Sequence, residues 1–202
     1  MSSATGYKPS ADEVRRLRED TGAGMIDCRN ALLEAGGDHD AAKKKLADQG
    51  RSTLAKKSER VAKEGLVGSY IHFGGKIGVL VEVNCETDFV ARNERFKELV
   101  RDIAMHVAAS PVLYLNREAV PAELLTEVKA ELAKSAEGKP ANIAQKIVEG
   151  KLNKWYEENI LLDQPFIKND EQTVGELIAS VVGVLGENIQ VRRYAKFALG
   201  EQ

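Results

Sequence analysis

Two strand-like runs on either side of Gly74-Gly75 constrain the fold of this chain more than any other feature. The run LVGSYIHF precedes the glycine pair, and KIGVLVEVN follows it. A two-glycine loop favours a β-hairpin because both turn positions tolerate positive φ. The second run alternates in hydrophobicity, so one of its faces should lie on the core: Ile77, Val79, Val81 and Val83.

The segment after the hairpin has the spacing of helices. An apolar stripe predicts a long helix that Pro111 limits: Phe96, Leu99, Val100, Ile103 and Val107. Further helices are predicted over 124–136, 142–158 and 173–185, and a last strand over 189–199 should pair with the hairpin. Hairpin, helices and late strand together predict an α+β core over 65–202, in which helices pack on a mainly antiparallel sheet.

The first fifty residues predict a small domain of three short helices. Ser10 and Glu13 have the spacing of a capping box, and the TGAG stretch should end the first helix. The second helix should end at Gly36-Gly37, and Asp38 can cap a third that Gly50 closes.

Residues 51–64 are basic and carry few apolar side chains, which predicts a linker between the two domains. The alternative is a basic strip that docks on an acidic partner surface. The residue pattern does not separate these two interpretations.

Composition limits the classes of partner. The 29 Lys and Arg residues nearly balance the 31 Asp and Glu residues, which argues against strong global attraction to nucleic acid. No apolar run reaches eighteen residues and the N-terminus lacks a signal-peptide pattern, so we expect neither a membrane span nor export. Cys28 and Cys85 lack metal-type spacing and fit a reducing cytoplasm.

The stretch NCETDFVARN, residues 84–93, could hold an acid–base or metal site. Glu82, Glu86 and Asp88 are close in sequence, and a magnesium site needs only one or two carboxylates beside a phosphate. The neighbouring GGKIG stretch lacks the spacing of a phosphate-binding loop. We therefore expect no cofactor and no metal here.

A thiol nucleophile is the other enzymatic possibility. Cys85 could pair with His72 or His106, but no spacing enforces either contact. Cysteine is more often a small core residue, and Cys28 lies on the apolar stripe of its own helix. His106 lies at the edge of an apolar helix face, where a neighbour can satisfy it.

Phe89 leaves a question that the pattern does not answer. Thr87 is a plausible N-cap, and Asp88 then falls in the first helical turn, where a carboxylate is favourable. If that helix continued, Phe89 would share the core stripe with Phe96, seven residues later. Asn93 is itself a good N-cap, so the earlier residues could instead form a separate turn that presents Phe89 as an anchor for a partner.

Two long stretches carry a resemblance to a known family. LREDTGAGMIDCRNAL, residues 17–32, and VEVNCETDFVARN, residues 81–93, resemble the signature stretches of the elongation factor Ts family, the guanine-nucleotide exchange factors of elongation factor Tu. The resemblance continues through IAMHVAAS, GKPANIAQKIVEGKLNKW, QPFIK and TVGELI, and so covers nearly the whole chain.

The resemblance implies an architecture and a site. The family has an N-terminal three-helix domain of ubiquitin-associated type, a linker and an α+β core. Its Thr-Asp-Phe-Val element enters the GTPase and disturbs magnesium coordination, a role that falls here on Thr87, Asp88, Phe89 and Val90. The exchange factor would bind elongation factor Tu–GDP, promote GDP release and stay bound until GTP binds.

Other contacts with the GTPase are implied for His106 and for the TGAG turn of the N-terminal domain: Thr21, Gly22, Gly24 and Met25. Longer family members carry a duplicated core, whereas this chain has one GVLVEVNCETDF unit. We therefore expect a homodimer that binds two GTPases. The competing hypotheses are a metal-dependent or thiol enzyme using Glu82, Glu86 and Cys85, and an adaptor that would leave the core unexplained.

Overall fold

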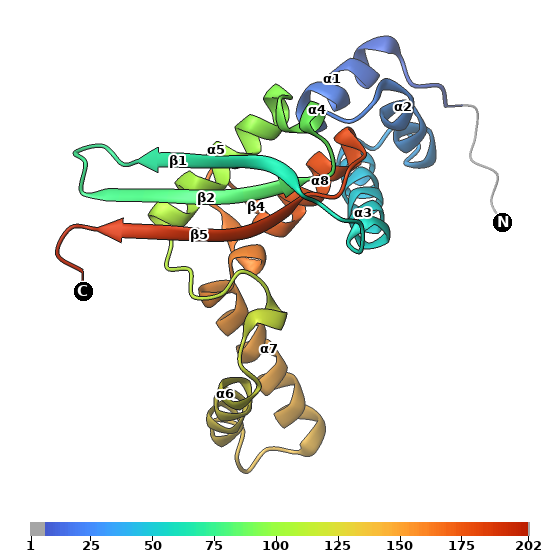
Figure 1. The fold of residues 1–202 in the computed structure, drawn as a ribbon. Coiled ribbons are helices and arrows are strands. Elements are labelled where there is room, and N and C mark those ends of the chain that lie inside the picture. The colour runs from blue at the N-terminus through green and yellow to red at the C-terminus, as the bar shows by residue number, and fades with distance from the viewer. Residues whose placement is uncertain (1–6, 202) are drawn as a thin grey trace. The chain divides into compact units, whose positions relative to one another are not determined.

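The computed structural model describes residues 7–201 (Figure 1). Its first half holds α1 (Ala11–Thr21), α2 (Met25–Glu34), α3 (His39–Lys57), β1 (Glu64–Ile71), β2 (Ile77–Cys85), α4 (Asp88–Ala91) and α5 (Glu94–Ala109). Its second half holds η1 (Arg117–Ala119), α6 (Ala122–Lys134), α7 (Ala141–Asn159), η2 (Leu161–Asp163), β3 (Pro165–Phe166), β4 (Asn169–Thr173), α8 (Val174–Leu185) and β5 (Gln190–Ala198). The mixture of helices with an antiparallel sheet confirms the predicted α+β class.

The described residues form two compact units, and each is built from segments that are distant in sequence. The first unit comprises residues 7–68, 81–101 and 176–192. The second unit comprises residues 69–80, 102–175 and 193–201. The division of the sequence into a domain at 1–50, a linker at 51–64 and a core at 65–202 stays a prediction.

The three-stranded sheet has the order β1-β2-β5, so the late strand pairs with the hairpin as predicted. Gly74 and Gly75 both have positive φ, 88° and 70°, and the N–H of His72 donates to the Ile77 carbonyl oxygen across the turn at 2.9 Å. Val79, Val81 and Val83 are buried, which confirms the predicted core face of β2 at these three positions, whereas Ile77 at the start of the strand is only half-buried.

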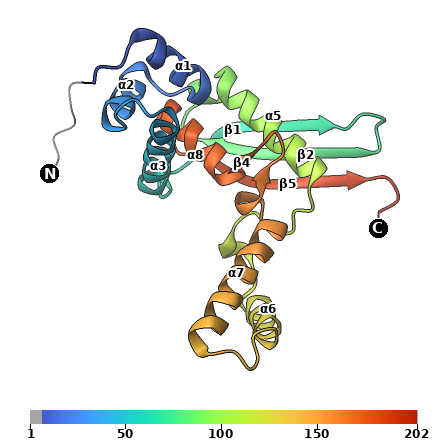
Figure 2. The ribbon, with the colours of Figure 1, turned by 180° about the vertical axis from the view of Figure 1, so that it is seen from behind.

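Helix α5 runs along one face of the sheet (Figure 2). The predicted apolar stripe is buried throughout: Phe96, Leu99, Val100, Ile103 and Val107. Gly68 of β1 lies so close to α5 that a Cβ atom there would overlap the side chain of Val100. The helix ends at Ala109, two residues before Pro111, as the sequence indicates.

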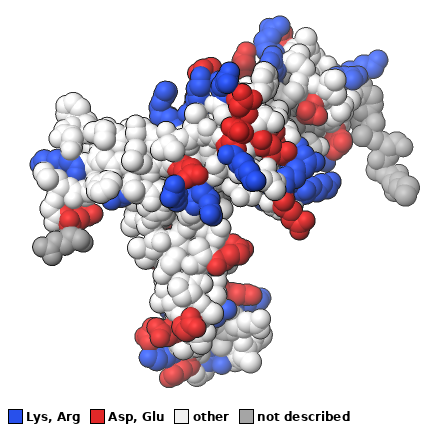
Figure 3. Space-filling model, viewed as in Figure 1, with Lys and Arg blue, Asp and Glu red and all other residues white. Residues whose placement is uncertain are grey.

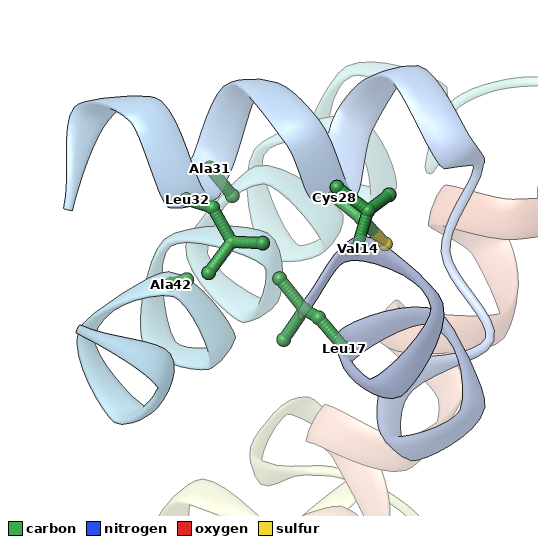
Figure 4. Packing of buried hydrophobic residues seen from close by; sticks show 6 residues of the cluster. All are labelled: Val14, Leu17, Cys28, Ala31, Leu32 and Ala42. Carbon is green, nitrogen blue, oxygen red and sulfur yellow. The ribbon is translucent and has the colours of Figure 1, made fainter. Parts of the chain in front are cut away.

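The N-terminal helices follow the predicted caps. The N–H of Ser10 donates to the Glu13 carboxylate at 2.7 Å, and Ser10 Oγ accepts from the N–H of Glu13 at 3.2 Å, which completes the capping box. Helix α1 ends at Thr21, and Gly22 is its C-cap with φ of 66°. A small apolar cluster fills the space between the three helices (Figure 4): Val14, Leu17, Cys28, Ala31, Leu32 and Ala42.

The predicted end of the third helix at Gly50 is wrong, because α3 continues to Lys57. Gly50 does not break the helix; it lies where α3 closely approaches the backbone of α8 at Ala179. Beyond it, Arg51 pairs with Glu176 of α8 at 2.5 Å, and Lys57 Nζ donates to the Gly186 carbonyl at the end of α8. Residues 51–57 are therefore helical, and Arg51 and Lys57 tie them to α8.

The hairpin of β3 and β4 was not predicted from the sequence. Strands β3 and β4 pair as a short antiparallel hairpin, with Pro165 opposite Thr173 and Phe166 opposite Asn169. A two-residue strand is too short to show alternation, so its pattern carried no signal. Helices α6 and α7, by contrast, lie within one to two residues of their predicted bounds. Within residues 7–201, no helix has the length and apolar character needed to cross a membrane.

Candidate functional site

A separate helical turn carries Phe89. Thr87 caps α4, since its Oγ1 accepts a hydrogen bond from the N–H of Val90 at 3.3 Å. Helix α5 begins only at Glu94, and Asn93 Oδ1 accepts from the N–H of Arg95 at 2.9 Å. The chain therefore breaks between α4 and α5, which answers the question that the pattern left open.

The break separates the environments of neighbouring side chains. Phe89 is 78% exposed, whereas Val90 and Ala91 are buried, as is Phe96 on α5. Asp88 is exposed and pairs with Arg92 at 2.9 Å, and an exposed pair of this kind contributes little to stability. Thus α4 has a buried base and presents a large aromatic ring to solvent.

Glu187, in the turn between α8 and β5, holds the start of α4. Its Oε2 accepts hydrogen bonds from the N–H groups of Glu86 and Thr87, both at 3.0 Å. Its Oε1 accepts from the Thr87 hydroxyl at 2.6 Å. Glu187 could not be inferred from the sequence, because it lies 100 residues from Thr87 and no local pattern indicates such a contact.

The geometry does not support the metal or thiol hypothesis. Burial raises the pKa of the Cys85 thiol to about 11, with a further contribution from the charge of Glu187, so this thiol is protonated at neutral pH. Its Sγ donates to the Thr87 carbonyl oxygen at 3.2 Å. The Glu86 carboxylate accepts from the N–H of Asn188 at 2.7 Å and lies 3.6 Å from the guanidinium of Arg60.

The other side chains considered for a metal or thiol site also have polar partners within the protein. The amide of Asn84 donates to the carboxylate of Glu82 at 3.4 Å. His72 Nδ1 lies 3.2 Å from the Tyr70 hydroxyl. Among residues 7–201, His, Cys, Asp and Glu side chains nowhere gather in a group of three suited to a metal ion.

The TGAG turn lies in the first unit together with α4, and Arg95 contacts it. Arg95 Nη2 donates to the Thr21 carbonyl oxygen at 2.9 Å, and its guanidinium fills the space beside Gly22. Gly24 is the N-cap of α2, and Met25 and Ile26 at the start of that helix are exposed. Arg95 could not be inferred from the sequence, because its position at a helix start is common for surface arginines.

His106 lies inside the second unit and is 1% exposed. Its Nδ1 accepts from the N–H of Ile167 at 3.3 Å, which leaves the ring proton on Nε2 to donate to Gln164 Oε1 at 2.9 Å. Burial lowers the pKa of His106 below its ordinary value. A contact between His106 and a partner stays a prediction, and in this structure its side chain has an internal role.

Comparison with known proteins gives the family. The family model described as "Elongation factor TS" matches residues 38–201. An elongation factor Ts of Geotalea uraniireducens (strain Rf4) is 55% identical over 194 residues, which cover 95% of this chain and 90% of that protein. An elongation factor Ts of Caldanaerobacter subterraneus subsp. tengcongensis is 53% identical over 194 residues, which cover 95% of this chain and 97% of that protein. The chain therefore belongs to the elongation factor Ts family, and its role is that of a translation elongation factor.

Proposed function

We propose that this chain promotes release of GDP from elongation factor Tu by inserting the α4 turn beside the magnesium and phosphates of the bound nucleotide. The observation that carries the proposal is the exposure of Phe89, 78%, on a turn whose neighbouring side chains are buried. Aromatic residues that are held rigidly in an exposed position are typical anchors of protein interfaces. Little side-chain or loop ordering is then needed when the partner binds.

Each of the four consecutive residues 87–90 has its own role in this proposal. Phe89 is the apolar wedge, and Val90 fixes the base of the turn from its buried position. Thr87 caps the turn, and Asp88, whose carboxylate is favourable in the first helical turn, supports its geometry and contacts the partner. None of them binds a metal or reacts covalently, so the chain acts by binding rather than as an enzyme.

Exchange follows from negative coupling between two ligands of the GTPase. If the factor and GDP disfavour one another on elongation factor Tu, each weakens the binding of the other by the same factor. Magnesium and the phosphates hold switch elements of GTPases, so displacing that region weakens nucleotide binding. Each 1.4 kcal/mol of coupling changes an equilibrium about tenfold. GTP then binds and the factor leaves.

A second contact with the GTPase is proposed at the TGAG turn. Thr21, Gly22 and Gly24 shape this turn, and it leads into the exposed side chains of Met25 and Ile26. The three-helix region that carries it, of ubiquitin-associated type by resemblance, shares the first unit with α4. Two contacts from one unit can bind one partner with a defined orientation.

We infer a homodimer that binds two GTPases. Exposed apolar side chains lie on or just beyond neighbouring strands in the second unit: Ile71, Leu80, Phe197 and Leu199. Charged side chains are sparse over this part of the sheet, whereas they gather over the N-terminal helices (Figure 3). An uncharged apolar sheet face is a typical interface between identical subunits.

Two further features of the chain fit the proposed function. The near balance of 29 basic and 31 acidic residues fits protein partners rather than RNA. Both cysteines are free, which fits the reducing cytoplasm.

Release of a fluorescent GDP from purified elongation factor Tu tests the exchange activity. We expect wild-type protein to accelerate release at substoichiometric concentration, and Phe89→Ala to lose most of that acceleration while remaining folded. The matched control is Phe73→Ala, since Phe73 is also an exposed phenylalanine, 98% exposed, in the hairpin turn of the second unit. Its activity should equal that of wild type.

Three results would contradict the proposal in different ways. Absence of acceleration by wild type with its cognate partner would exclude exchange activity. Full activity of Phe89→Ala would exclude the wedge. Equal losses in Phe89→Ala and Phe73→Ala would assign the effect to general apolar contact.

Light scattering tests the proposed homodimer. At micromolar concentration the wild-type protein should give twice the chain mass, and Phe197→Asp should give the monomer mass. A monomeric wild-type protein would exclude the homodimer.

A further inference from the structure

We propose that Glu187 is a positioning residue of the exchange turn: it orients Thr87, and through Thr87 it sets the position of Phe89. This inference rests on the proposed function, because it concerns the same turn. It adds a residue 100 positions later in the sequence, in the connection between α8 and β5. The resemblance and the spacing of residues 84–93 assign no role to it.

The turn needs an external constraint. Helix α4 has four residues, and so short a helix does not form without tertiary contacts because its first hydrogen bond must order several residues. Val90 and Ala91 anchor its C-terminal half by burial. Its N-cap residue, Thr87, is held by Glu187, which accepts from the Thr87 N–H, and by the thiol of Cys85, which donates to the Thr87 carbonyl oxygen.

Glu187 acts on the cap through the Thr87 hydroxyl. That hydroxyl has one proton, which it donates to Glu187 Oε1 at 2.6 Å. Its lone pairs are then free to accept the N–H of Val90, the bond that caps α4 at 3.3 Å. A carboxylate accepts only and so imposes this direction, and its bonds to N–H and O–H donors are stronger than those of a neutral acceptor.

The segment around Glu187 is itself held from several sides. Lys57 donates to the carbonyl of Gly186, the preceding residue. Asn188, the following residue, is fully buried; its N–H donates to Glu86 Oε1 at 2.7 Å and its amide to the Arg60 carbonyl oxygen at 2.7 Å. Thus the Glu187 carboxylate accepts from the backbone N–H groups of Glu86 and Thr87. The Glu86 carboxylate in turn accepts from the N–H of Asn188, the residue after Glu187. This reciprocal arrangement fixes both segments.

The functional test separates positioning from stability by steady-state kinetics. In the GDP-release assay, Glu187→Ala should lower kcat at least about tenfold, as expected when charge-assisted hydrogen bonds are lost, with KM changed less than about threefold because encounter with the partner relies on other surfaces. Glu187→Asp keeps the charge but shortens the side chain, so its kcat should fall as in Glu187→Ala. Glu187→Gln keeps the side-chain length and should recover part of the lost kcat. The control is Glu127→Gln, an exposed glutamate of α6, which should match wild type.

A double-mutant comparison tests whether Glu187 acts through Phe89. Adding Glu187→Ala to Phe89→Ala should cause little further loss, since the residue that it positions is already absent. A full additional loss would overturn the inference, as would wild-type kcat in Glu187→Ala. Inactive wild-type protein would instead overturn the proposed function, before any variant is compared.

A measurement on the free protein keeps the inference testable without a partner. Amide hydrogen exchange should become faster at Glu86, Thr87 and Val90 in Glu187→Ala, with little change in α6 and α7. Unchanged protection at these three amides would overturn the inference even if activity fell. If Glu187→Ala loses protection throughout, that variant is unfolded and Glu187→Gln is compared instead. Wild-type protection and wild-type kcat in Glu187→Gln would overturn the proposed role of the charge.

Discussion

Gly50 of α3 lies against Ala179 of α8, so close that a Cβ atom on Gly50 would stand 2.7 Å from the Ala179 carbonyl oxygen. The opposite helix also has a glycine, Gly183, where a Cβ would lie 3.5 Å from the Gly50 Cα. Small residues on both helices permit this close approach. The glycine that looked like the end of a helix is therefore a packing residue.

Gly50→Ala should lower the free energy of unfolding by about 1 to 3 kcal/mol, the usual cost of overpacking, because the added methyl group meets rigid backbone. The matched control is Gly150→Ala in α7, where an added Cβ atom would meet no neighbouring atom within 4 Å. That substitution should raise the free energy of unfolding by about 0.5 to 1 kcal/mol through helix propensity. Urea unfolding measures both, and stabilisation by Gly50→Ala would exclude the close contact.

Arg95→Ala should loosen the TGAG turn. The variant loses the bond to the Thr21 carbonyl and leaves a space beside Gly22. Loss of a hydrogen bond from a charged donor costs about 1.5 to 3 kcal/mol. Amide exchange in α1 and α2 should therefore become faster. Arg101→Ala removes an exposed arginine from the same helix and should leave that exchange unchanged; equal effects of the two variants would contradict a specific tie.

Much of the fold could be predicted because local signals agree with tertiary packing. The Gly74-Gly75 turn, the alternation in β2 and the stripe of α5 each depend on residues close in sequence, and each was confirmed. The end of α3 was not predictable, because whether a glycine breaks a helix or packs against another depends on what faces it. The two-residue strand β3 was missed for want of a pattern.

The candidate site divides in the same way. The cap at Thr87 is a local feature, and both possible environments of Phe89 could be stated from the sequence. The choice between them depended on whether α4 and α5 join, which a single N-cap residue, Asn93, could not decide alone. Glu187 and Arg95 act across 100 and 74 residues, and such distances leave no trace in local spacing.

Cys85 should react slowly with thiol reagents in the native protein. Raising its pKa from 9.0 to about 11 lowers the thiolate fraction at pH 8 by roughly 100-fold, since each pKa unit is a factor of ten, and burial adds a steric barrier. Labelling at pH 8 followed by peptide mass spectrometry should show slow reaction of Cys85 in buffer and rapid reaction in urea. Rapid labelling of Cys85 in the folded protein would revive the thiol hypothesis.

Acidification should destabilise the protein through His106. Burial lowers the pKa of this ring in the folded state, so below the unfolded-state value of about 6.5 the unfolded chain binds more protons than the folded one. The contribution of His106 to stability is therefore fully present above about pH 6.5 and decreases as the pH falls below it, by at most about 1.4 kcal/mol per pH unit. Urea unfolding between pH 7.5 and 5.5 should show this slope. His106→Gln should reduce it, whereas His72→Gln, which replaces an exposed histidine of the same unit, should retain it. Equal slopes in wild type and His106→Gln would mean that the ring accepts a proton in place, which is incompatible with Nδ1 accepting the N–H of Ile167.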